Sequence, residues 1–206
     1  MMRSLPSAVR LWSMAKRIWI SGSALVWFAF LILVLPLPWL IAALCAAGFH
    51  ELCHMLAVSL CGGRLGGLRI TGRGAALDTA ALSRGQELLC ALAGPVGSLS
   101  LALAGALWPR MAVCALFHGL YNLLPVYPMD GGRLLRCGAA LLLGEARAEA
   151  VCLWGARITF AMLLLAGAYS LIVLQWGCFP LFLAGFVIYK ANLRKFPCKD
   201  GFRRVQ

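Results

Sequence analysis

Charged side chains are scarce in this chain, and acidic side chains are the scarcest. Only 13% of the 206 residues are charged and seven are Asp or Glu, whereas 62% are hydrophobic. An ordinary soluble domain carries about 25% charged residues. The composition therefore excludes such a domain and predicts several membrane-spanning helices in a lipid bilayer.

The sequence also lacks the patterns of a disulfide framework, a zinc knuckle or a nucleic-acid surface. Its nine cysteines include no C-x-x-C pair, and most lie inside apolar runs, so we interpret them as small, reduced hydrophobic residues. The net charge of +12 is not interleaved with aromatic residues but falls between the apolar runs, which is typical of membrane topology. We therefore expect no nucleic-acid partner.

The apolar runs predict an all-α polytopic membrane protein with about six transmembrane helices. The break at Leu35-Pro36-Leu37-Pro38 separates the first two spans, and a Pro- and Gly-containing stretch at 122–132 interrupts the fourth. We interpret the first span as a retained helix and not as a cleaved signal peptide. The expected spans are Ile18–Leu35, Trp39–Leu60, Leu88–Leu107, a broken fourth segment from Met111 to Leu143, Ile158–Gln175 and a short one at Phe179–Tyr189.

The first polar stretch, residues 61–87, is rich in glycine and arginine. Leu68–Ile70 and Ala75–Thr79 have the composition of two short strands around a turn at Gly72–Gly74. This predicts a small β-hairpin-like loop at the membrane surface, between the second and third helices. Two alternatives stay open: a flexible cytoplasmic loop, or a hairpin whose free edge pairs with an extended substrate.

The distribution of basic residues predicts the orientation. If both termini, the 61–87 loop and residues 133–157 are cytoplasmic, every Lys and Arg except Arg110 lies inside. We therefore expect a multi-pass membrane protein with both termini on the cytoplasmic side. Residues 1–17 form its basic cytoplasmic N-terminus and residues 190–206 its basic cytoplasmic tail.

One stretch carries ionisable groups where an apolar helix disfavours them. His50-Glu51-Leu52-Cys53-His54, an H-E-x-x-H pattern, lies near the middle of the second span. Histidines four residues apart share one helix face and can hold a single zinc ion, while Glu51 is placed to act as a general base for the water that the metal activates. Ionisable groups inside a span are expensive and point to function.

A catalytic zinc takes three protein ligands and one open position, so a third ligand must come from another segment. We favour Asp130, because it lies where the fourth segment breaks and restarts, and its carboxylate can be turned into a cavity there. The helix is expected to resume through Arg133–Leu143, with Asp130 also placed to cap it. His118 is the alternative, as a ligand, a pocket residue or a structural histidine. The full set of candidates is His118, Asp78, Asp130, Glu87, Glu145 and Glu149.

Three motifs together resemble the site-2 protease family, peptidase family M50. They are H-E-x-x-H, Ala93-Gly94-Pro95 and the N-x-x-P-x-x-P-x-D-G-G pattern from Asn122 to Gly132. The resemblance covers spans two to four, about half of the chain. The layout is similar to the branch of stage IV sporulation protein FB, although we expect neither the C-terminal CBS domain of some members nor a PDZ insertion. We expect one membrane-embedded domain spanning residues 1–206.

The resemblance implies an intramembrane zinc metalloprotease that cleaves membrane-tethered or single-span proteins. One zinc ion per chain would be held by His50, His54 and Asp130, with Glu51 as catalytic acid/base and Asn122 positioning the substrate or stabilising the oxyanion. The sporulation branch implies a protein of the bacterial cell membrane, located in the mother-cell membrane around the forespore. It also implies regulated intramembrane proteolysis of a sigma-factor precursor. An inhibitory membrane protein would restrain the protease.

Three rival interpretations remain open at this point. The chain could be a non-catalytic zinc-binding membrane protein or transporter, a pseudo-enzyme chaperone for membrane segments, or a membrane-anchored protease of soluble peptides.

Overall fold

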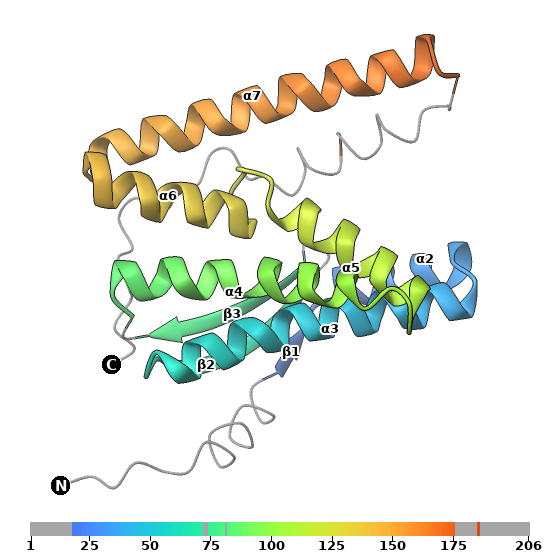
Figure 1. Ribbon diagram of the computed structural model, residues 1–206, viewed down its shortest axis with the longest axis horizontal. Coiled ribbons are helices and arrows are strands. Elements are labelled where there is room, and N and C mark those ends of the chain that lie inside the picture. Colours follow the sequence, from blue (N-terminus) through green and yellow to red (C-terminus); the bar gives the residue numbers. More distant parts are fainter. Residues whose placement is uncertain (1–17, 72–73, 81, 176–184, 186–206) are drawn as a thin grey trace, which may run out of the picture. The chain divides into compact units, whose positions relative to one another are not determined.

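The computed structural model describes residues 18–71, 74–80, 82–175 and 185. The expected N-terminal segment 1–17, the tail 190–206 and all but residue 185 of the expected sixth span lie outside the described residues. The described part is mostly helical, with one small sheet (Figure 1). It divides into two compact units, one ending at Gly119 and the other beginning at Leu120.

The first expected span is only partly helical. Ile18–Ile20 is a strand, β1, and the helix α2 covers Gly22–Val34. The Ser21 hydroxyl caps α2 by accepting a hydrogen bond from the Ala24 amide at 3.3 Å. The helix ends before Pro36, because a residue that precedes proline is disfavoured in the helical conformation. At 13 residues, α2 is about 20 Å long, shorter than the roughly 30 Å hydrocarbon core of a bilayer.

Two long helices form the body of the first unit. Helix α3 (Leu37–Leu60) begins at the Pro36–Pro38 break, and α4 (Arg84–Leu103) packs against it. Ser83 and Gln86 form a capping box at the start of α4. The Gln86 side chain also donates to the Cys61 carbonyl at 3.0 Å, which ties the first turn of α4 to the end of α3. Pro95 lies buried inside α4.

The predicted hairpin is present and longer than expected. Strands β2 (Arg64–Thr71) and β3 (Gly74–Ala80) pair antiparallel, while β1 pairs parallel with β2 on its other side. The order is therefore β1-β2-β3. The pairing with β2 explains why residues 18–20 are extended, since it satisfies backbone groups that a helix would otherwise use. Within the described residues β3 is an edge strand.

The fourth segment is interrupted as expected. Helix α5 (Pro109–Asn122) ends at Asn122, and α6 (Asp130–Leu143) follows after a loop that contains a cis peptide bond between Tyr127 and Pro128. The expectation that Asp130 caps a helix resuming at Arg133 is wrong. Met129 is the N-cap, and Asp130 is the first residue of α6, because the helical turn already begins there.

In the second unit, α7 (Glu145–Ile172) begins well before the predicted fifth span, since Gly144 allows an immediate turn from α6 with a φ of 84°. Helices α6 and α7 pack against each other. The loop before α6 and one face of α7 together form a small buried core of Val126, Met129, Ala156 and Phe160.

Within the described residues, three helices are long and apolar enough to cross a membrane, namely α3, α4 and α7, and α2 is a shorter apolar helix. Large hydrophobic side chains are widely exposed along them; Leu33, Leu60, Leu103 and Leu165 are each at least 71% exposed. Exposed apolar surface on this scale is expected where lipid replaces water. The described residues thus support a helical membrane protein, and the six-span count stays a prediction.

Candidate metal centre

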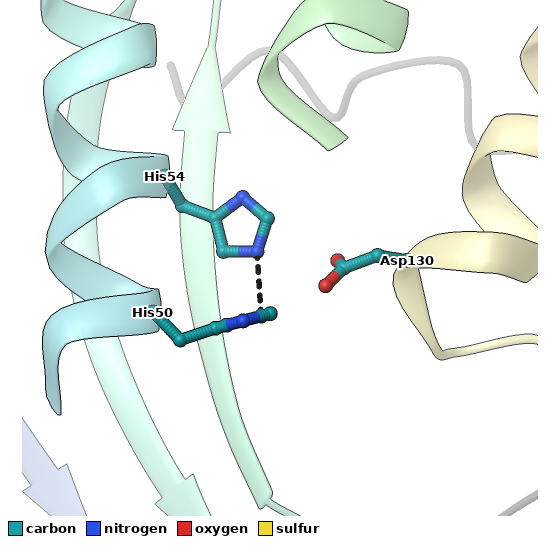
Figure 2. A group of neighbouring side chains, drawn as sticks. All are labelled: His50, His54 and Asp130. Carbon is teal, nitrogen blue, oxygen red and sulfur yellow. Dashed lines mark hydrogen bonds between the residues drawn. The ribbon is translucent and has the colours of Figure 1, made fainter. Parts of the chain in front are cut away.

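His50 and His54 lie one turn apart on α3 and are both buried, at 1% and 7% exposure. Their rings meet edge to face, with centroids 4.7 Å apart and planes at 80°. The two Nε2 atoms approach to 3.1 Å (Figure 2). The H-E-x-x-H spacing therefore brings the two Nε2 atoms together on one face of α3.

Helix α4 holds the opposite edge of each ring. The Nδ1–H of His54 donates to the Cys90 carbonyl at 2.7 Å, and His50 Nδ1 forms a hydrogen bond with the Ser98 hydroxyl at 2.8 Å. A carbonyl oxygen can only accept, so His54 carries its proton on Nδ1, which leaves the Nε2 lone pair for a metal. Histidines that bind metals usually donate their other ring nitrogen to an oxygen in this way.

Glycine makes the approach of the two helices possible. A Cβ atom at Gly94 would collide with Nε2 of His54 and would lie 2.7 Å from Nε2 of His50. One turn along, a Cβ at Gly97 would collide with the Cys53 thiol. The space beside both Nε2 atoms therefore exists because residue 94 has no side chain.

Glu51 and His118 accompany the pair in the first unit. Glu51 is half-buried on α3, next in sequence to His50. His118, on α5, is also half-buried and stacks edge to face on His50, with ring centroids 4.7 Å apart. The structure thus places the His118 ring in direct contact with the ring of His50, a predicted ligand.

Asn122 and Asp130 belong to the second unit. Asn122 is the last residue of α5, and Asp130, 7% exposed, begins α6. The backbone turns tightly here: a Cβ at Gly131 would collide with the Leu123 carbonyl, and one at Gly132 with the backbone of Val126. Among the other acidic candidates with described side chains, Glu145 and Glu149 are exposed and Glu87 is half-buried.

The sequence indicated the histidines but not the residues that orient them. Cys90 acts through its backbone carbonyl, which no side-chain pattern reveals. Ser98 follows Gly94 by one helical turn and so shares its face, and this spacing was the available signal.

The residues present fit a zinc ion. Two zinc-bound nitrogens in a tetrahedral site are separated by about 3.3 Å, given zinc–nitrogen bonds of about 2.05 Å. The 3.1 Å between the two Nε2 atoms is close to that separation. Imidazole nitrogens and a carboxylate are also the ligand types that catalytic zinc takes.

Comparisons with known proteins agree with this chemistry. The model of Peptidase family M50 matches residues 81–166, which include α4, Asn122 and Asp130 but not His50 and His54. The fold is similar to that of the site-2 protease from Methanocaldococcus jannaschii, with a TM-score of 0.61 and 19% identity, over 84% of this chain and 88% of that chain. No curated protein sequence matches. The family match covers under half of the chain and the structural match shows a shared fold, and neither singles out a branch of the site-2 proteases.

Proposed function

We propose that this chain is an intramembrane zinc metalloprotease that hydrolyses peptide bonds in membrane-tethered or single-span proteins. The observation that carries the proposal is the buried histidine pair of α3. Its two Nε2 atoms lie 3.1 Å apart on a helix long enough to cross a membrane. Burying two imidazoles in such a helix is costly, and a metal centre gives the reason for it.

The metal would be held by His50 and His54 together with Asp130, one zinc ion per chain. All three side chains are buried, and each offers one ligand atom of a type that zinc accepts (Figure 2). When bound, zinc supplies Lewis-acid polarisation of the scissile carbonyl and lowers the pKa of water toward neutrality.

The proton transfers fall to Glu51. Its carboxylate takes a proton from the attacking water and delivers it to the leaving amine as the peptide bond breaks. The Asn122 side chain carries an amide N–H that can donate to the developing oxyanion or to the substrate backbone. The division of roles is therefore two imidazoles and a carboxylate for the metal, a second carboxylate for protons, and an amide for charge.

A transmembrane substrate must leave its helical conformation before cleavage, because helical hydrogen bonds occupy its carbonyls. The sheet of the first unit offers replacement partners. In the part of the chain that the structure describes, strand β3 lies at the edge of the order β1-β2-β3, so its outer backbone groups can pair with an extended segment. This supports an extended peptide in a membrane setting as the substrate class.

The finer features of the proposal come from the sequence. We propose one membrane-embedded domain of about six spans, with both termini cytoplasmic and the active site reached from the cytoplasm. The asymmetry of Lys and Arg supports this orientation. Activation of a sigma-factor precursor during sporulation, under an inhibitory membrane partner, follows from the resemblance to the sporulation branch.

Co-expression with candidate single-span substrates tests the proposal. Intact protein should cleave a true substrate, and Glu51→Gln should lower the rate by about 10²- to 10⁴-fold, the usual contribution of a general acid/base. Glu51→Gln should still bind one zinc ion, whereas Asp130→Ala should lose zinc and activity together. His118→Ala, which keeps all three proposed ligands, should retain zinc.

The outcomes separate the rival functions. Equal cleavage by the intact protein and Glu51→Gln would overturn the mechanism. Zinc binding without any cleavage that depends on Glu51, across the whole substrate panel, would favour a non-catalytic zinc protein or transporter. Zinc retained in Asp130→Ala but lost in His118→Ala would assign the third ligand to His118.

A further inference from the structure

We propose that Ser98 is the positioning residue of His50, holding the ring through its hydroxyl in the orientation that zinc binding requires. This inference rests on the proposed function, since it concerns the same metal. Its evidence is separate, because it comes from the contact between α3 and α4.

The Ser98 hydroxyl forms a hydrogen bond with another helix and not with its own. Serine and threonine hydroxyls in helices commonly bond back to a carbonyl of their own helix. Ser100 does so with Val96 at 2.8 Å, and Thr159 with Gly155 at 2.7 Å. Ser98 instead bonds to Nδ1 of His50, at 2.8 Å and 48 residues away in sequence. Its hydroxyl is therefore committed to another helix.

The burial of Ser98 makes this hydrogen bond costly to lose. Ser98 is 0% exposed, so its hydroxyl has no exchange with solvent to offset the cost of an unsatisfied polar atom. Gly119 of α5 also lies against Ser98, since a Cβ atom added at Gly119 would lie 2.9 Å from the Ser98 Cβ. Ser98 is thus held between α3 and α5, and its Oγ stays in reach of His50.

The two histidines differ in the group that binds Nδ1, which is a hydroxyl for His50 and a carbonyl for His54. The Cys90 carbonyl only accepts, so it alone fixes the tautomer of His54. A hydroxyl can either donate or accept, so His50 keeps Nε2 available only when its Nδ1–H donates to Ser98. Removing the hydroxyl leaves the His50 ring without this partner while the His54 ring keeps its own.

The test measures zinc affinity in the Glu51→Gln background, by competition with a chromophoric chelator on the detergent-purified full chain. Ser98→Ala should weaken zinc binding by about 10- to 100-fold, the usual effect of losing an outer hydrogen-bond partner of a metal ligand. Ser100→Ala is the matched control on the same helix and should bind zinc as tightly as the parent. Ser98→Cys, close in size but a weaker hydrogen-bonding group, should fall between.

A second readout separates positioning from packing. The chain has three histidines, so ¹⁵N labelling of histidine gives three imidazoles to follow in the zinc-loaded protein. Ser98→Ala should change the Nδ1–H signal of His50 and leave that of His54 intact, whereas a general loosening of the helices would change both.

Two results would overturn the inference. One is zinc affinity in Ser98→Ala within twofold of the parent; the other is an equal change at both histidines. Either leaves the proposed function standing, provided that cleavage still depends on Glu51. Failure of the parent protein itself to bind zinc would instead refute the proposed function, and this inference with it.

Discussion

Replacing Gly94 by alanine adds a single methyl group at the point where the two ligand nitrogens converge. The new Cβ would lie 2.7 Å from Nε2 of His50 and closer still to Nε2 of His54, whereas ordinary contacts begin at 3.4 Å. The His50 ring must therefore move away by about 0.7 Å, and the His54 ring by more. Metal sites tolerate deviations of about 0.2 Å, so both ligands leave bonding positions.

The expected effect on zinc is at least about 100-fold weaker binding, or roughly 2.8 kcal/mol. The expected effect on the fold is small. The atoms that Cβ meets belong to imidazole rings, which can rotate away, and alanine is favoured over glycine inside a helix by about 1 kcal/mol. Gly94→Ala should thus keep its helicity and its apparent Tm in detergent while losing zinc.

The assay compares zinc stoichiometry, chelator competition and circular dichroism for Gly94→Ala and Gly48→Ala. Gly48 lies on α3 close to the histidines, and an added Cβ there meets nothing within 4 Å, so this variant should bind zinc normally. If Gly94→Ala binds zinc as tightly as the parent, the two nitrogens do not point at the space beside residue 94, and the site geometry is wrong.

Two further predictions concern stability, read as apparent Tm in detergent. Gly131→Ala should destabilise the second unit by about 1–3 kcal/mol or more, because its Cβ would collide with the Leu123 backbone carbonyl. Gly155→Ala should be nearly neutral, because the one close contact of its Cβ is the tip of the flexible Leu135 side chain and Pro125 lies at ordinary contact distance. Equal effects of the two substitutions would contradict the tight turn before α6. Gln86→Ala should lower the stability by about 1 kcal/mol through loss of the capping box. Gln86→Glu should recover part of this stability, because glutamate keeps the hydrogen-bond acceptor of the capping box but lacks the donor to the Cys61 carbonyl at the end of α3. If the parent and both variants have the same Tm, the cap is refuted.

The sequence predicted elements best where one pattern dominated. The second and third spans were placed to within about four residues, because long apolar runs bounded by proline or polar residues leave few alternatives. The hairpin was placed from its glycine-rich turn. The strand at 18–20 was missed, because an apolar run of Ile and Trp is equally compatible with a helix until a partner strand is known.

At the candidate site, the sequence by itself indicated which side chains lie together on α3. An H-E-x-x-H pattern fixes two imidazoles on one helix face and a carboxylate beside them, since helical spacing is a local property. It likewise indicated the helix break before Asp130, because proline and glycine act on their own backbone.

Only the tertiary structure decided how the histidines are held. The bonds of His54 to the Cys90 carbonyl and of His50 to Ser98 join residues 36 and 48 positions apart, and the room at Gly94 depends on how closely α4 approaches α3. Such contacts arise from packing between helices, and no local pattern encodes which carbonyl or hydroxyl will face a given ring. The candidate ligands were therefore readable in the sequence, whereas the hydrogen bonds that hold their rings were not.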